Sequence, residues 1–464
     1  MVHDMTQGSI RGHVLRMVSF VFAGLAIQTL YSLVDIFWVG RLGERAVAAV
    51  ALSTNLMFLS LALTQTLSVG CVALVSQAAG RKDAQAVQRL FNQAQSLSVC
   101  AGLAFFAGSL AFMGVYTERL SGDAQTAQLA REFLVYFIPS MALQFTMVGL
   151  ASALRGIGDM KPGLVAQTLS VLFNMILAPF LIFGWFGTKP LGVAGAALST
   201  LVATLAAVIG LSVYLARGGS SLRVSFADWR PDFSVWRRML SIGLPAGTEF
   251  VFISLNMGVI YAAMKKFGPE AQAGFGIGSR VMQAGFMPAV AISFSVAAVV
   301  GQNFGAGAYP RVREAYRESA KLTVVLMLLF TLVCQVVPAP MVRAFTADAG
   351  SIEVGADYLR SISLMYVASG LVFVIAGIFQ GIGNTWPSLA CSAVRCLLFV
   401  GPVAALMVHG DFEIHTIWIL SVASVFVQLG LCLYLLRREL AIKVPLTAPA
   451  TAASDQSAYL TEQP

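Results

Sequence analysis

The sequence predicts an all-α membrane protein with twelve transmembrane helices in two pseudo-symmetric six-helix bundles. Three observations predict this fold class. Of the 464 residues, 58% are hydrophobic and 11% are charged, whereas a soluble protein has about 25% charged residues. Twelve apolar runs are each long enough to span a bilayer, which takes about 20 residues. A single offset of 225 residues aligns the first half of the chain with the second.

The apolar runs follow one another with short polar connections. Helices are predicted, since a membrane barrel shows alternating segments of about ten residues and lipid admits only helices or closed barrels. The first run is too long for the apolar core of a signal peptide and has no small-residue cleavage site behind it, so we interpret it as the first span. The predicted spans are 17–39, 46–72, 91–115, 132–153, 163–184, 191–216, 239–264, 274–300, 322–345, 357–379, 388–408 and 414–436.

The longest polar connection lies between the sixth and seventh runs and divides the chain. We expect an N-terminal lobe (1–216), a cytoplasmic linker (217–238), a C-terminal lobe (239–440) and a disordered tail (441–464). With the N-terminus placed inside, nineteen Lys and Arg residues fall in the cytoplasmic connections and eight on the opposite side. This excess predicts that both termini are cytoplasmic. The expected location is the plasma membrane, which is the inner membrane of a bacterium.

The offset of 225 residues keeps loop residues in register as well as apolar ones. It brings Gln77 onto Gln302 and Gly80 onto Gly305, and LRGIGDMKP (154–162) onto FQGIGNTWP (379–387). The two glycines follow apolar helices as C-terminal capping glycines do. Because each half has an even number of spans, both halves enter the membrane in the same direction. Parallel repeats of this kind enclose a cavity near the membrane midplane and are typical of transporters.

Three polar side chains inside spans are candidates for function, since a charge in hydrocarbon is costly. Glu249 lies about ten residues into the seventh run, which is roughly 15 Å and near the midplane. Asp35 is the sole carboxylate of the first run but lies near its outer end, where an interfacial Asp facing water is the alternative. Asn174 lies mid-span in the fifth run and either coordinates a cation or bridges two helices. Glu249 has the alternative of a structural hydrogen bond to a neighbouring helix.

Further residues in the spans are weaker candidates. Arg395 lies mid-span and is interpreted as an internal partner for a carboxylate or a backbone carbonyl. Aromatic and Met side chains either line a polarisable cavity or simply pack between helices, and packing is the commoner role. These residues are Tyr31, Met57, Tyr136, Met141 and Phe145, of which Tyr136 is included in the predicted substrate site.

Other functional classes lack their motifs. No Gly-Lys dipeptide occurs, which excludes a Walker P-loop, and HExxH and GxSxG are also missing. We therefore expect no enzymatic activity and no cofactor, with energy from an ion gradient or a partner protein. The net charge of +8 comes from short clusters between apolar runs, which indicates a membrane-leaflet bias and no nucleic-acid partner. The expected state is a monomer in the lipid bilayer.

At this point several motifs resemble the multidrug and toxic compound extrusion (MATE) family. They are LYSLVDIFWVGRLG (30–43), SQAAGR (76–81), LRGIGDMKP, and the region from Asn174 through FGTKPLGVAGAALST. The resemblance covers nearly the whole chain in the right order. It implies a V-shaped pair of six-helix bundles that exports organic-cation drugs or dyes in exchange for Na⁺ or H⁺. The remaining alternative is a flippase for a lipid-linked precursor, from the same wider superfamily.

The resemblance also implies roles for the polar residues. Asp35 occupies the position of the family's first-helix Asp, which binds the coupling cation in the N-terminal lobe, and Asn174 matches the fifth-helix Asn of that site. Both would be Na⁺ ligands if coupling uses sodium. Some relatives carry another Asp or Asn where this chain has Ala178, so one ligand is missing here. No carboxylate lies opposite Asp35 in the second half, where Ile260 stands, and Glu249 is the leading candidate in that lobe.

Overall fold

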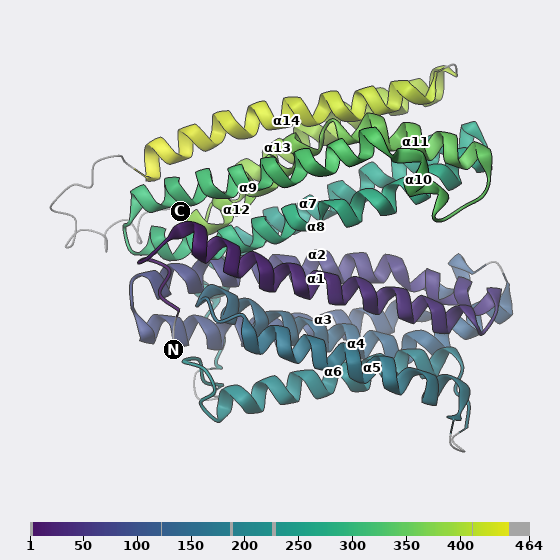
Figure 1. Ribbon diagram of the computed structural model, residues 1–464. Helices are drawn as coiled ribbons and strands as arrows, with labels where there is room; N and C mark the ends of the chain where they lie inside the picture. Colours follow the sequence, from purple (N-terminus) through teal and green to yellow (C-terminus); the bar gives the residue numbers. More distant parts are fainter. Residues whose placement is uncertain (1–2, 122, 186–188, 225–228, 411, 445–464) are drawn as a thin grey trace.

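The computed structural model describes residues 3–121, 123–185, 189–224, 229–410 and 412–444, and within these ranges all regular structure is helical. The predicted tail falls mostly on residues 445–464, which lie outside the described ranges. The N-terminal lobe consists of α1 (Ile10–Gly40), α2 (Glu44–Gly80), α3 (Ala84–Leu120), α4 (Ala124–Gly156), α5 (Lys161–Phe183) and α6 (Val193–Ala216). The two lobes lie side by side, and both described ends of the chain lie at one end of the molecule (Figure 1). We call this the termini end, and the opposite end the open end.

The C-terminal lobe has more helices because two of its spans are interrupted. It consists of α7 (Phe233–Met264), the short 3₁₀ helix η3 (Lys265–Phe267), α8 (Pro269–Gly305), α9 (Tyr309–Val336), α10 (Pro338–Arg343), α11 (Ala349–Ser363), α12 (Tyr366–Ile382), α13 (Trp386–His409) and α14 (Ile414–Lys443). The last six residues of the predicted linker, 233–238, form the first turns of α7, and α14 continues three residues past 440.

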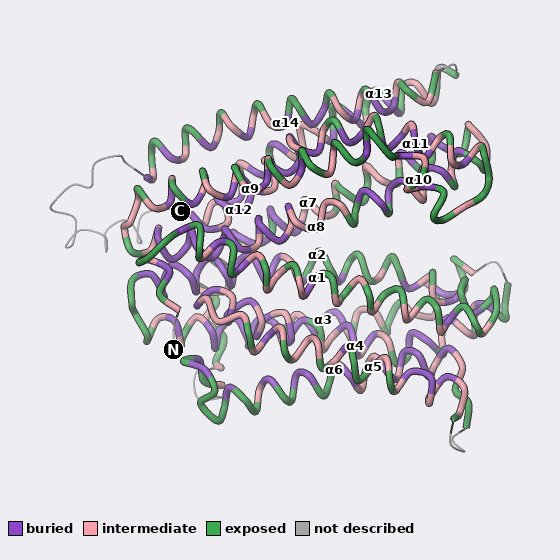
Figure 2. Tube along the Cα trace, viewed as in Figure 1, coloured by how far each residue is buried: buried purple, intermediate pink, exposed green. Residues whose placement is uncertain are grey.

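The number of spans agrees with the sequence prediction. Among the described residues, eleven helices are long and apolar enough to cross a membrane, and the pair α11 and α12 makes a twelfth, bent by 55°. Exposed residues run along the outer sides of both bundles (Figure 2). Many of the exposed side chains are large and apolar, for example Leu33, Phe112, Leu169, Leu329 and Ile419. Such a surface needs lipid to cover it, because water would leave too large an apolar area exposed.

Two predicted spans of the C-terminal lobe were placed wrongly. The run 322–345 is not one helix, since α9 ends at Val336 and Pro338 starts α10. The run 357–379 crosses the bend between α11 and α12. Side chains of α9 satisfy the carbonyls that this bend frees: Thr331 donates to the Ser363 carbonyl at 2.9 Å, and Gln335 donates to the Arg360 carbonyl at 2.7 Å. A broken helix is stable inside a membrane only with such partners.

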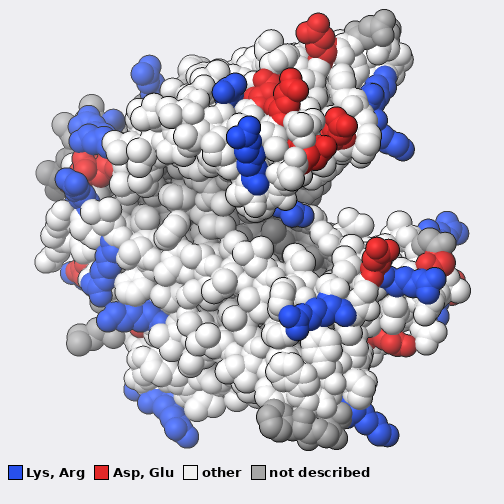
Figure 3. All heavy atoms as spheres, turned by 45° about the vertical axis from the view of Figure 1, so that its right-hand side comes forward, with Lys and Arg blue, Asp and Glu red and all other residues white. Residues whose placement is uncertain are grey.

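The lobes touch at the termini end and diverge toward the open end. Across the lobe interface, α2 packs against α7 and α8, and α1 packs against α8. The space-filling view shows the surface hollowed between the two lobes at the open end (Figure 3). The structure is therefore closed at the termini end, with a cleft reaching in from the other side.

The contact between the lobes repeats the 225-residue symmetry in its atoms. Gln77 of α2 donates its side-chain amide to the Gly381 carbonyl at 2.9 Å. Gln302 of α8 donates to the Gly156 carbonyl at 3.0 Å, and both members of this second pair lie 225 residues beyond or before their counterparts. Each lobe thus supplies one glutamine and one helix-terminal carbonyl, so two equivalent hydrogen bonds hold the termini end together.

Gly80 and Gly305 serve this contact rather than a left-handed cap. Neither residue has a positive φ, so the predicted capping role was wrong. A β-carbon added at Gly80 would lie 1.9 Å from the Gln302 carbonyl oxygen, and one added at Gly305 would lie 2.1 Å from the Gln77 carbonyl oxygen. The repeated glycines are present because two helix backbones meet there, as small residues allow in membrane helix packing.

The segment before α1 crosses the same contact. The His3 N–H donates to the Ile157 carbonyl of the N-terminal lobe at 3.1 Å. Two residues on, the Met5 N–H donates to Gln302 Oε1 at 3.0 Å, and the Met5 carbonyl accepts from Asn303 at 3.1 Å. The Met5 side chain is fully buried. This segment therefore joins the two lobes on the side where they are closed.

Asp232 anchors the linker to both lobes and gives a prediction outside the membrane. It caps α7 by accepting from the Ser234 N–H at 3.1 Å, and it pairs with Arg89 of α3 at 2.5 Å. The Ser234 hydroxyl and then the Arg89 guanidinium lower the pKa of Asp232 to about 2. Because the folded pKa lies below the unfolded value of about 3.9, this stabilisation is complete above about pH 4 and is lost as the pH falls toward 2.

Replacing Asp232 by alanine should therefore lower the melting temperature at neutral pH, with a cap loss of about 1 kcal/mol. The difference in melting temperature from the wild type should shrink between about pH 4 and pH 2. Thermal unfolding of the purified protein in detergent measures both. Glu353→Ala is the matched control, because Glu353 is exposed and makes no hydrogen bond or ion pair within the described ranges. A difference that stays constant across this pH range would contradict the assignment.

Candidate functional site

The N-terminal lobe contains a polar cluster built from three helices. Asn174 of α5 is 4% exposed, and its side-chain amide donates to the hydroxyls of Ser199 at 3.2 Å and Thr200 at 3.1 Å, both on α6. The hydroxyl of Tyr31, on α1, lies 3.0 Å from that of Thr200. Thr200 also donates to the Ala196 carbonyl, so it accepts from its two partners. The cluster therefore ties α1, α5 and α6 together through one threonine.

Asp35 lies one helical turn from Tyr31, on the same side of α1. Its side chain is half-buried, and no residue within the described ranges donates a hydrogen bond to its carboxylate or forms an ion pair with it. Asn174 is not in direct contact with Asp35, but both approach the Tyr31–Thr200 pair. The carbonyl oxygen of the Asn174 amide likewise has no donor in the described part of the chain. Carboxylate, amide and hydroxyl oxygens are what a hard cation prefers.

The structure does not bring Tyr136 to this cluster. Tyr136 lies on α4 and is 36% exposed, and it makes no hydrogen bond within the residues that the structure describes. In the same residues no group of three or more His, Cys, Asp or Glu side chains gathers. A cation at Asp35 would therefore depend on one carboxylate and neutral oxygens, and a contact of Tyr136 with substrate stays a prediction.

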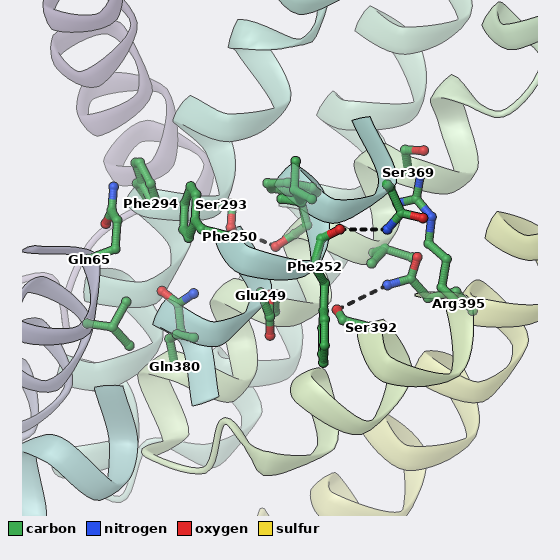
Figure 4. Close-up of a pocket in the computed structure, with 18 residues that line it drawn as sticks. Gln65, Glu249, Phe250, Phe252, Ser293, Phe294, Ser369, Gln380, Ser392 and Arg395 are labelled. Carbon is green, nitrogen blue, oxygen red and sulfur yellow. Dashed lines mark hydrogen bonds between the residues drawn. The ribbon is translucent and has the colours of Figure 1, made fainter. Parts of the chain in front are cut away.

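Glu249 lies in the C-terminal lobe at a cavity of about 60 Å³. The hydroxyl of Ser388, on α13, donates a hydrogen bond to its carboxylate. The cavity is walled by α7, α8, α12, α13 and α14, and by Gln65 and Val69 of α2. Figure 4 shows Glu249 between Gln380 on one side and Phe252 on the other. A cavity of this size holds a few waters or a small polar group but is far below the about 300 Å³ of a drug-sized pocket.

Several polar atoms at this cavity are buried without a partner. Gln428 is 3% exposed and donates to the Ser392 hydroxyl at 3.3 Å. Buried polar groups are normally hydrogen-bonded, so unpartnered ones at a cavity indicate that water, an ion or a ligand group completes them. Among the described residues, the unpartnered atoms at this cavity are Asn256 Oδ1, Ser369 Oγ, Arg395 Nε and Gln428 Oε1.

The sequence interpretation missed several of these residues. Thr200, Ser199, Asn256 and Gln428 were not singled out, although Asn256 and Gln428 are amides within apolar runs, as Asn174 is. That signal was available for the two amides. The serines and threonines carry no such signal, since hydroxyls are common in membrane helices, where they bond to their own backbone.

Comparisons with known proteins agree with the fold and the order of the motifs. The MatE family model matches residues 21–180 and 245–406, which is more than half of the chain. A probable multidrug resistance protein NorM of Thermotoga maritima is 24% identical over 421 residues, covering 90% of each chain. A second, from Bradyrhizobium diazoefficiens, is 27% identical over 416 residues and covers 86% of each. A solved structure of a multidrug resistance MATE family transporter in an outward-facing conformation superposes with a TM-score of 0.87 at 21% identity, covering 95% of this chain and 98% of that one.

Proposed function

The chain belongs to the MatE family of membrane transporters, and from that premise we propose that it is a multidrug efflux antiporter, which exports lipophilic organic cations in exchange for Na⁺ or H⁺. The relatives named as probable multidrug resistance proteins support the efflux of drugs. The exchange itself is inferred from the placement of the carboxylates. Asp35 lies in one lobe and Glu249 in the other, on the two sides of a lobe contact that has to open and close.

The observation that carries the proposal is the composition of the Glu249 cavity. Its walls include Gln65 and Val69 of α2, which belong to the other lobe. Any movement that parts the lobes therefore removes part of the wall around Glu249. A cation bound at this carboxylate favours one arrangement of the lobes over the other, and a ligand moves an equilibrium only through such a difference in affinity.

Exchange then follows from competition for a few acidic groups. With the termini end open, a lipophilic cation enters from the cytoplasm or the inner leaflet and is held by a carboxylate. With the open end exposed to the outside, as in this structure (Figure 3), Na⁺ or H⁺ neutralises Asp35 and Glu249, and the drug cation loses its counter-charge. This orientation places the termini end in the cytoplasm of a bacterial cell, in keeping with the Lys and Arg bias of the connections.

The test is efflux of a fluorescent organic cation from vesicles that contain the purified protein, with a Na⁺ gradient and a pH gradient imposed separately. Dye should leave faster under at least one of the two gradients than in protein-free vesicles. Dye movement that responds to neither gradient would contradict the exchange. Export of a lipid-linked precursor without any export of dye would favour the flippase instead.

A further inference from the structure

Arg395 carries a positive charge at mid-depth in the C-terminal lobe. It lies nine residues into the 24-residue helix α13, about 14 Å from the start of that helix, and it lines the Glu249 cavity. Its Nε is buried and has no partner. Within the described ranges, the guanidinium makes no hydrogen bond and no ion pair, and its electrostatic neighbours are the thiol of Cys396 and the hydroxyl of Tyr358.

The nearby carboxylates do not balance this charge. Glu249 is bonded by Ser388, which precedes Arg395 on α13 by seven residues, or about 10 Å along the helix. Asp357 accepts from the Trp418 indole at 3.0 Å and lies 3.5 Å from His415. Neither acid pairs with the arginine, in contrast to the expectation of an internal ion pair. A charge at this depth normally has a partner, so the structure leaves a place for an anion.

The surroundings of Arg395 fit a carboxylate. Figure 4 places Ser369 and Arg395 on the same side of the cavity and Glu249 away from them. The Ser369 hydroxyl is buried without a partner, so it offers a second donor beside the guanidinium. The planar fork of an arginine matches a carboxylate in two parallel hydrogen bonds. At about 60 Å³, the cavity admits such a group but not the body of a drug-sized molecule.

A second arginine lies on the same wall of the cleft. Arg280 of α8 is exposed and unpaired within the described ranges. Residues seven apart lie on nearly the same face of a helix, and the next two positions of this stripe face the other lobe. Met287 lies 3.8 Å from the Thr29 hydroxyl, and Phe294 packs under the guanidinium of Arg155 at 5.2 Å. Arg280 therefore faces the cleft from the C-terminal lobe, where it attracts anions toward the cavity.

We propose that Arg395 binds the carboxylate of a substrate, so that this transporter accepts amphipathic molecules that carry an acid together with their cation. The cationic group is held at the carboxylates of the proposed exchange, and the acid enters the cavity beside Arg395 and Ser369. This inference rests on the proposed export function. It differs from that function in assigning an anion-binding residue, which a transporter for simple cations does not need.

The experiment compares two dyes that differ only in the acid. One is a rhodamine with a free carboxyl group, and the other is the methyl ester of the same rhodamine. Efflux of both is measured from vesicles that contain wild-type protein, Arg395→Gln, Arg395→Lys or Arg360→Gln. The readout is the ratio of the free-acid rate to the ester rate. This ratio should fall at least about ten-fold in Arg395→Gln, as expected when one partner of a buried charge pair is removed, and less in Arg395→Lys.

Arg360→Gln is the matched control, because this arginine lies on α11 of the same lobe with an exposed side chain, so its replacement should leave the ratio unchanged. If Arg395→Gln does not give a monodisperse protein, Arg395→Lys decides, since it keeps the charge and loses the fork. An equal fall for both dyes, or an unchanged ratio, would overturn the proposal. Wild-type export of the ester alone would overturn the proposal and leave the efflux function standing. Export of neither dye would refute the efflux function itself.

Discussion

Replacing Asp35 by asparagine is expected to lower ion-driven efflux of a cationic dye by at least about ten-fold, which corresponds to 1.4 kcal/mol of lost discrimination. Asparagine keeps the size of the side chain and removes its charge. Asp35 has no hydrogen-bond or ion-pair partner in the described part of the chain, so the substitution breaks no bond that the structure shows. The polar cluster of Tyr31, Asn174 and Thr200 stays intact. The melting temperature should therefore change little while transport falls.

The matched control for this variant is Glu132→Gln. Glu132 is an exposed carboxylate on α4 of the same lobe, and it accepts a hydrogen bond from Gln128 at 3.0 Å. Both variants remove one negative charge from the N-terminal lobe, so a difference between them reports the position of the charge. Efflux is measured at equal protein content under a Na⁺ gradient and under a pH gradient. Unchanged efflux and unchanged ion dependence in Asp35→Asn would remove Asp35 from the mechanism.

The sequence predicted the spans and the duplication well, because both are written in local composition and in register. Apolar runs of about 20 residues leave the helix as the main choice in lipid, and the observed helices extend past the predicted runs where they leave the hydrocarbon. The break between Ser363 and Tyr366 could not be predicted. It is stabilised by Thr331 and Gln335, which lie on another helix, and nothing in the run itself marks them as partners.

The candidate site was predictable only in part, for a related reason. A lone acid or amide in a span is conspicuous, which is why Asp35, Asn174 and Glu249 were identified. Its partners come from other helices and are often hydroxyls, which do not stand out in an apolar run. The spacing along one helix also cannot show that Arg395 lacks a counter-charge, since a carboxylate on any packed neighbour would supply one. Tyr136 shows the converse, because its position in a span did not place it at the polar cluster.

Replacing Gly80 by valine is expected to keep the lobes from closing at the termini end. The added β-carbon would lie 1.9 Å from a backbone oxygen of Gln302, and a backbone cannot rotate away as a side chain does. Overpacking of a tight interface costs about 1 to 3 kcal/mol, which opposes the state that the Gln77 and Gln302 hydrogen bonds hold. The same reasoning applies to Gly305→Val, whose β-carbon would lie 2.1 Å from the Gln77 carbonyl oxygen.

The measurement is the distance between spin labels at Gln85 and Arg317, which are exposed near the termini end of the two lobes, in a protein whose six cysteines have been replaced. Gly80→Val should move the distance distribution to longer values and reduce dye efflux. Gly210→Val is the matched control, since a β-carbon at this helical glycine meets nothing within 4 Å. Because Gly80 and Gly305 meet each other's lobes in equivalent ways, the two variants should act alike. A distribution in Gly80→Val that matches the control would mean that the lobes close without this contact, and that the symmetric glutamines do not hold the termini end shut.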